Sequence, residues 1–139
     1  MDIEVYDSIK KGLEEHFNSL NLSKSYKPAV VGFEPSKPTY PMVKIQEIRN
    51  VPDSRFYGRL ETVANLGYKV DVYAKQQTGV SKQDVARKLA KHCNDYLTCI
   101  GLRQVSWNEF ENDGVNGDLY RVTIMYNTNY FEQRKTILL

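Results

Sequence analysis

The chain has 139 residues, of which 41% are hydrophobic and 26% are charged, and its formal net charge is +2. This length predicts one domain with a core large enough to need no disulfide bonds. So small a net charge does not by itself indicate a polyanionic partner. No stretch approaches the roughly 18 consecutive apolar residues of a membrane span, and the acidic amino end lacks the pattern of a secretory signal. We therefore expect a folded protein in the cytoplasm.

The first predicted element is an amphipathic helix over residues 2–20. Its acidic residues Asp2, Glu4 and Asp7 suit the positive end of the helix dipole. Apolar positions recur at spacings of three and four, which is the helical period. These positions are Val5, Ile9, Leu13, His16, Phe17 and Leu20.

A proline-rich region follows, with strand-like runs at residues 29–33 and 42–48. Prolines are tolerated at the starts and edges of strands, so we expect two strands on either side of a proline loop. Residues 50–65 then lack a clear period, and an irregular connection of this length in a compact domain is usually functional or mobile. We expect a projecting loop at 50–65, while its second half, 59–64, also fits an extension of the next strand through a bulge.

The central strand is predicted over residues 66–73, where apolar and polar residues alternate as they do in a sheet with one buried face. An amphipathic helix is predicted next, over residues 82–100. Ser81 is expected to cap its amino end, with Asp84 three residues on. Gly101 follows as a left-handed cap at the carboxyl end.

A terminal antiparallel hairpin is predicted from a strand at residues 103–107, a turn region at 108–118 and a long strand at 119–130. The Asp-Gly and Asn-Gly pairs in the turn region are strong turn signals. The tail, residues 131–139, ends in Ile-Leu-Leu and is expected to dock on this subunit or on another. The whole order predicts a single α+β domain, 1–139, with a mostly antiparallel sheet and two amphipathic helices packed on one face.

The search for catalytic and metal motifs finds no phosphate loop, no HExxH, no CxxC and no nucleophile elbow. His16 and His92 lie on apolar helix faces, which favours core histidines over ligands or bases. Cys93 and Cys99 lie six residues apart, a spacing that fits neither a redox pair nor a zinc site, so reduced thiols are expected. We predict no enzyme, no cofactor and no metal.

Two clusters of charged residues could each be a binding site or simply a surface exposed to solvent. The acidic residues Glu109, Glu111, Asp113 and Asp118 surround a turn and include calcium-type ligands, but their spacing is not that of an EF-hand, which favours a solvated turn. The predicted second helix has a basic face that fits either solvent or nucleic acid, and Asp84 and Asp95 interrupt it. This basic face consists of Lys82, Arg87, Lys88 and Lys91.

The chain is rich in tyrosine, with ten residues. Such residues are enriched at protein–protein interfaces, because they bury a large area and keep a polar tip. They are equally favoured in ordinary strands, so both interpretations stay open. Those in or beside the predicted strands are Tyr40, Tyr57, Tyr68, Tyr73, Tyr120, Tyr126 and Tyr130.

Four stretches together carry a resemblance to a known family. They are Tyr-Pro-Met-Val-Lys-Ile at 40–45, Gly-Tyr-Lys-Val-Asp-Val-Tyr at 67–73, Ile-Gly-Leu-Arg at 100–103 and Tyr-Arg-Val-Thr-Ile-Met-Tyr at 120–126. With the amino-terminal helix, this pattern resembles the tail-terminator and head–tail joining (tail-completion) proteins of long-tailed bacteriophages. The resemblance spans nearly the whole chain, although its motifs are patterns of alternation and not an invariant signature.

The resemblance implies a structural virion protein that forms a ring, usually a hexamer, and terminates the tail or joins it to the head. It implies as partners the tail-tube protein and the head connector protein, with nucleic acid only passing through the ring. It implies location in the tail or neck of the virion, after assembly in the host cytoplasm.

Arginine and aromatic side chains dominate interface energetics, so the residues expected at an oligomer interface lie in the 50–65 loop and the apolar tail. They are Arg55, Phe56, Tyr57, Arg59, Ile137 and Leu138. The alternative function is a small nucleic-acid-binding module that uses the basic helix face and the sheet aromatics.

Overall fold

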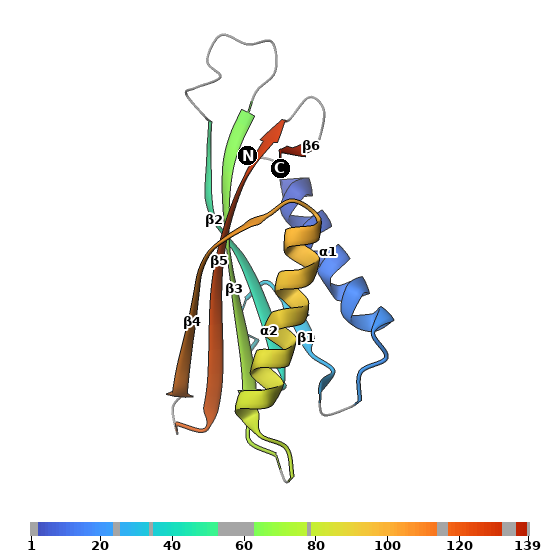
Figure 1. The fold of residues 1–139 in the computed structure, drawn as a ribbon, viewed down its shortest axis with the longest axis vertical. Helices are drawn as coiled ribbons and strands as arrows, with labels where there is room; N and C mark the ends of the chain where they lie inside the picture. Colours follow the sequence, from blue (N-terminus) through green and yellow to red (C-terminus); the bar gives the residue numbers. More distant parts are fainter. Residues whose placement is uncertain are drawn as a thin grey trace.

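The computed structural model describes residues 3–23, 26–33, 35–52, 63–77, 79–113, 117–131 and 136–138. Within these residues the chain forms two helices and six strands (Figure 1). In chain order they are α1 (Ile3–Ser19), β1 (Ala29–Val31), β2 (Met42–Pro52), β3 (Val63–Lys75), α2 (Lys82–Cys99), β4 (Arg103–Asp113), β5 (Leu119–Phe131) and β6 (Thr136–Leu138).

The sheet has the strand order β1-β2-β3-β5-β4, with β6 paired to β5. Only β1 and β2 run parallel among the described pairs, and all the other pairs are antiparallel. The expected α+β fold with a mostly antiparallel sheet and two helices is therefore confirmed. The central position of β3 is also confirmed, because β3 pairs with β2 on one side and with β5 on the other.

Helix α1 has the predicted apolar face, and Val5, Ile9, Leu13 and Phe17 are buried. It contacts α2 and β1. Gly12 allows a close approach of the two helices, because a Cβ at this position would overlap the hydroxyl of Tyr96 in α2.

Helix α2 ends as the sequence predicts. Gly101 has a φ of 106°, and the N–H groups of Gly101 and Leu102 donate to the carbonyls of Thr98 and Leu97, which is the Schellman pattern. The prediction for the other end is wrong in part. Ser81 stands at the N-cap position, but its side chain makes no capping hydrogen bond. Gln76 Oε1 instead accepts a hydrogen bond from the backbone N–H of Lys82, at 3.4 Å.

Two predicted boundaries need correction. Strand β4 continues to Asp113 and takes in half of the expected turn region, because residues 106–110 pair with β5. The predicted loop at 50–65 is shorter, because 50–52 pair with 64–66 as the ends of β2 and β3. Residues 53–62 lie outside the described residues.

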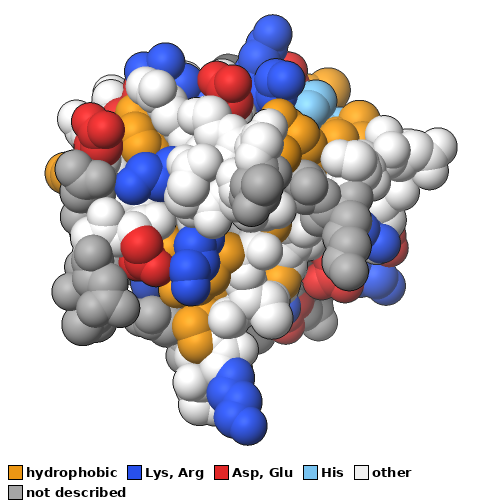
Figure 2. All heavy atoms as spheres, turned by 90° about the horizontal axis from the view of Figure 1, so that it is seen from below, with side chains coloured by type: hydrophobic (Ala, Val, Ile, Leu, Met, Phe, Trp, Pro, Cys, Tyr) orange, Lys and Arg blue, Asp and Glu red, His pale blue; other side chains and the backbone are white. Residues whose placement is uncertain are grey.

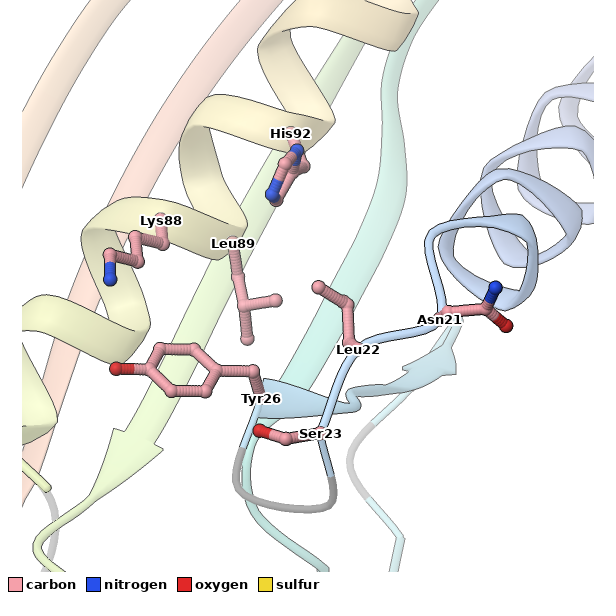
Figure 3. A pocket seen from close by; sticks show the side chains of 7 residues that line it. All are labelled: Asn21, Leu22, Ser23, Tyr26, Lys88, Leu89 and His92. Carbon is pink, nitrogen blue, oxygen red and sulfur yellow. The ribbon is translucent and has the colours of Figure 1, made fainter.

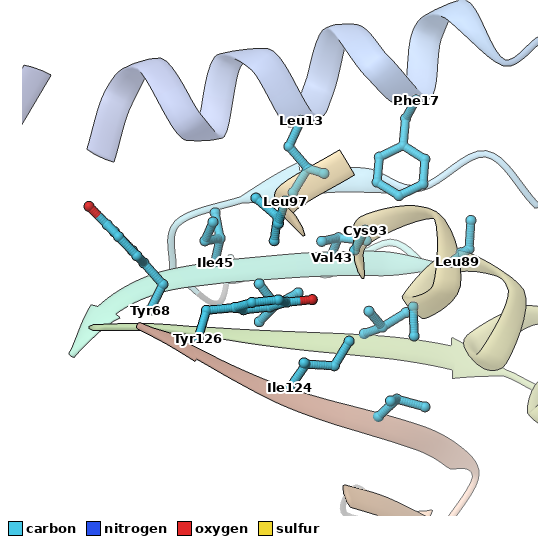
Figure 4. Packing of buried hydrophobic residues seen from close by; sticks show 14 of the residues in the cluster. Leu13, Phe17, Val43, Ile45, Tyr68, Leu89, Cys93, Leu97, Ile124 and Tyr126 are labelled. Carbon is cyan, nitrogen blue, oxygen red and sulfur yellow. The ribbon is translucent and has the colours of Figure 1, made fainter. Parts of the chain in front are cut away.

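The core lies between the helices and β2, β3 and β5. Figure 4 shows Leu13 and Phe17 of α1, with Leu97 of α2, pointing toward Val43 and Ile45 of β2. α2 contacts β3, β5 and β4. Among the described residues, no helix is long and apolar enough to cross a membrane.

Tyr68, Tyr120 and Tyr126 belong to this core and are at most 5% exposed. The expected surplus of surface tyrosine is therefore smaller than the sequence indicates. Their hydroxyls keep polar partners: that of Tyr126 donates to Asn94 Oδ1 at 2.9 Å and that of Tyr120 to Glu109 Oε1 at 2.7 Å. Buried phenols usually have such partners, so the buried rings of Tyr120 and Tyr126 keep their hydroxyls hydrogen-bonded.

Candidate interaction surface

The predicted interface residues divide into two groups. Arg55, Phe56, Tyr57 and Arg59 lie outside the described residues. Residues 137 and 138 belong to β6, which pairs antiparallel with residues 129–131 of β5. The backbone of the apolar tail thus docks on its own chain, as one of the two expected outcomes, and a role of Ile137 and Leu138 in an interface stays a prediction.

The register of the sheet brings together a second set of residues, on the positions that alternate with the core. Lys44 lies opposite Asp71, Asp71 opposite Thr123, and Lys69 opposite Met125. Directly paired residues share a face of a sheet. We call this set the outer face: Lys44, Gln46, Arg49, Lys69, Asp71, Tyr73, Phe110, Arg121, Thr123 and Met125.

Asp71 stands at the centre of the outer face and is only 1% exposed. Its Oδ1 accepts a hydrogen bond from the Thr123 hydroxyl at 2.5 Å. Lys69 Nζ and Arg121 Nη1 each lie 3.7 Å from its carboxylate. A buried charge is costly unless it is paired and hydrogen-bonded, and these three neighbours from β3 and β5 meet that requirement.

Two aromatic rings of the outer face are each covered by a cation. The guanidinium of Arg121 lies 4.2 Å from the ring centre of Phe110, and Lys44 Nζ lies 5.7 Å from that of Tyr73. Both distances fall within the range of cation–π attraction. Phe110 remains 41% exposed and Met125 38% exposed. The outer face thus combines fixed cations with accessible apolar groups.

Gly67 explains how Arg49 fits on this face. The pairing of β2 with β3 shifts register between Glu47 and Arg49. A Cβ on Gly67 would come within 2.9 Å of the Arg49 Cβ. The missing side chain leaves room for Arg49 beside β3.

Glu109 forms a separate network, which joins β4 to α2 and β5. Its carboxylate accepts hydrogen bonds from Arg87 Nε at 2.6 Å, from the Tyr120 hydroxyl at 2.7 Å and from Trp107 Nε1 at 3.3 Å. Partial burial raises the pKa of Glu109, but the hydrogen bonds from Arg87, Tyr120 and Trp107 outweigh it, and the net pKa is lowered. The interpretation of Glu109 as part of a solvated acidic turn is wrong, because it is bonded within a strand.

This network predicts a pH dependence of folding. A carboxyl whose folded pKa is depressed stabilises the fold above its unfolded pKa, and the contribution is lost as the pH falls through the folded value. The wild type should therefore lose more free energy of unfolding between about pH 7 and about pH 3 than Glu109→Gln does. Urea denaturation at both pH values measures the difference. Equal losses in the two proteins would contradict the prediction.

The remaining charges at this end of the sheet have mixed signs. Lys75 Nζ lies 3.5 Å from Asp118 Oδ2. Figure 2 shows the molecule from below, with acidic and basic side chains interspersed and hydrophobic ones in small groups between them. Within the described part of the chain, no three His, Cys, Asp or Glu side chains form a group that could hold a metal ion.

A cavity of about 270 Å³ lies between α2 and the segment after α1. Figure 3 shows Lys88, Leu89 and His92 of α2 facing Leu22 and Tyr26 across it. Lys88 Nζ lies 5.1 Å from the Tyr26 ring centre.

The histidines occupy the apolar helix faces that the sequence predicts, and both cysteines are free thiols, as expected. His16 stacks on Tyr96 at 5.1 Å between ring centres, and His92 meets Phe17 edge-on at 6.5 Å. Cys93 is buried, and burial raises the pKa of its thiol well above the ordinary value, so it stays protonated and unreactive at neutral pH. Cys99 is exposed.

Sequence reasoning missed the Asp71 network, although one signal was present. Asp71 occupies a polar position in the alternation of 66–73, but it is an acidic residue between two valines, and acidic residues are depleted in strands. Its partner Thr123 is 52 positions away, so only the pairing of β3 with β5 brings the two together.

The residues of the outer face come from four strands. Arginine, aromatic and methionine side chains are enriched at protein interfaces, and all three types are present. No model of a known protein family matches the chain, and no curated protein matches it.

Proposed function

We propose that this protein is a structural subunit that binds copies of itself through the outer face. We infer that α1 and α2 cover the same face of the sheet. Two observations support this inference: the residues of β2, β3 and β5 that belong to the hydrophobic core alternate with those of the outer face, and α2 contacts both α1 and the sheet. The outer face is then the side of the sheet that is left for a partner.

The single observation that carries the proposal is that charged side chains of the outer face are already held in place within the subunit. Asp71 fixes Lys69 and Arg121, and Arg121 in turn lies over Phe110. Side chains that are held in place before docking lose less entropy on association. A solvated face has no need of a buried carboxylate at its centre, whereas a docking face benefits from one that positions its cations.

The biological setting is proposed from the resemblance to phage tail-terminator and head–tail joining proteins. In this setting the subunit forms a structural ring at the junction of tail and head, in contact with the tail-tube protein and the head connector protein. Its location is the neck or tail of the virion.

The alternative, a nucleic-acid-binding module, has weaker support. Arg87 of the basic helix face is bonded to Glu109 and Lys88 lies over Tyr26. The rings of Tyr73 and Phe110 are covered by Lys44 and Arg121. Bases that stack on these rings would first have to displace the cations.

Mass photometry and sedimentation velocity over a range of concentrations test the proposal. A ring-forming subunit should show one oligomer of discrete size, whose population increases with concentration. It should also bind the ends of purified tail tubes or connectors of its own phage. A chain that stays monomeric and also binds neither tubes nor connectors would overturn the proposed function.

A further inference from the structure

We infer that the outer face of one subunit binds the exposed side of α1 of the next subunit. The inference rests on the proposed function and names the two surfaces of the subunit contact. It follows from the charges that each surface carries, from their spacing and from the difference between the two helices.

The outer face carries an excess of positive charge. Lys44, Arg49, Lys69 and Arg121 are four cations, and Asp71 is the one carboxylate among the residues that define this face. Its net charge is thus +3. Asp71 neutralises part of the charge of Lys69 and Arg121, so Lys44 and Arg49 keep the larger share of uncompensated charge, while Lys69 and Arg121 remain partly exposed cations beside them.

The exposed side of α1 carries the opposite charge. Asp7, Glu14 and Glu15 are exposed, and Lys11 is the cation exposed among them in the described part of α1. The net charge of these four is −2. Opposite charges across an interface raise the association rate and select the partner.

The spans of the two surfaces match. Asp7 and Glu14 are seven residues apart, which is two helical turns or about 10 Å. Lys44 of β2 lies two strand spacings, about 10 Å, from the Thr123 position of β5, and Arg121 is two residues farther along β5, so the Cα atoms of Lys44 and Arg121 are about 12 Å apart. One helix laid on the outer face therefore places its carboxylates within reach of cations from both strands.

The other helix does not offer this complementarity. Its exposed charged residues are Asp84, Arg87, Lys88, Lys91 and Asp95, with a net charge of +1. A positive helix would be repelled by a positive face. Charge thus selects α1 as the helix that fits.

Both surfaces are present on every copy, and they are different surfaces. Figure 1 shows α1 and β4 on opposite flanks of the molecule. Each copy therefore presents its outer face to one neighbour and α1 to another. Such head-to-tail contacts produce a ring when the rotation per subunit closes.

A charge-swap experiment tests the inference. The face variant is Lys44→Glu with Arg49→Glu, which keeps Thr123, Lys69 and Arg121 as partners of Asp71 but adds a carboxylate on the position opposite Asp71, so its folding is measured separately. The helix variant is Glu14→Lys with Glu15→Lys. Each variant alone presents two surfaces of like charge and should associate at least tenfold more weakly than the wild type. An equimolar mixture pairs opposite charges at every contact and should recover association to within about threefold.

Sedimentation velocity at about 50 mM and about 300 mM salt gives the readout, and association of the wild type should weaken as salt screens the charges. Lys91→Glu on α2 is the control for a changed net charge and should associate as the wild type does. Circular dichroism melts confirm that each variant is folded. A folded face or helix variant that associates normally, or a mixture without recovery, overturns the inference.

Two further outcomes separate this inference from the proposed function. If the wild type forms oligomers that no charge change affects, the inference fails and the structural role stands. If the wild type stays monomeric, the inference fails, and binding to tail tubes decides the proposed function separately. Binding of a fluorescent single-stranded oligonucleotide that the face variant loses and the helix variant keeps would assign the outer face to nucleic acid instead.

Discussion

Leu97→Ala is expected to lower the free energy of unfolding by about 3 kcal/mol, within the range found for leucine truncation in well-packed cores. Leu97 is fully buried, and Figure 4 shows it between Leu13 of α1 and the sheet. Its truncation removes apolar contacts and leaves a cavity where α1, α2 and β2 meet. The loss should be large because Leu97 also provides the carbonyl that accepts from Leu102 at the end of α2, which limits how far the helix can move to fill the space.

Urea denaturation followed by circular dichroism measures this change. Leu97→Met is the matched control, since a swap that preserves volume usually costs less than about 1.5 kcal/mol. The proposed docking surfaces do not include Leu97, so the variant should still associate at low temperature while it is folded. A loss below about 1 kcal/mol would show that this part of the core repacks readily.

Asp71→Ala is expected to destabilise the fold by about 2–3 kcal/mol, somewhat less than the usual loss for one partner of a fully buried ion pair. The expected loss is smaller because the side chains of Lys69 and Arg121 are partly exposed, at 30% and 25%. The substitution removes the acceptor of the Thr123 hydrogen bond. It also leaves two cations side by side without the carboxylate between them.

Asp71→Asn separates the two effects, because the amide keeps an acceptor for Thr123 but carries no charge. We expect it to be more stable than Asp71→Ala and less stable than the wild type in urea denaturation. Association should weaken in both variants, because Lys69 and Arg121 lose the group that positions them. If Asp71→Ala were as stable as the wild type, the carboxylate would have no structural role, and the order of the outer face would need another cause.

Much of the fold was predictable from local signals. The period of three to four in α1 and α2, the alternation at 66–73 and Gly101 after α2 each depend on residues close in sequence, and backbone geometry imposes those patterns directly. The same local reasoning failed at Ser81. Capping there is taken over by Gln76, which the 77–80 turn brings to the start of α2.

The candidate surface was far less predictable than the fold. Sequence reasoning placed the interface in 50–65 and the tail, of which 53–62 lie outside the described residues. It did not find Lys44, Asp71, Phe110 and Arg121 as one surface, because they come from four strands and meet only through the register of the sheet. Sequence reasoning left open whether the strand tyrosines lie at an interface or within the sheet, and Tyr68 and Tyr126 are buried in the core.

The sequence by itself determined the kind and order of the elements from α1 to β5, because hydrophobic period, turn residues and helix ends act over a few positions. It did not predict the strand β6 in the tail. Tertiary structure decided which face each strand residue occupies and which distant residues meet. A shift of one residue in the pairing of β3 with β5 would move Asp71 into the core and take Thr123 away from it. Burial of Val70, Val72, Val122 and Ile124 fixes that register, and the outer face follows from it.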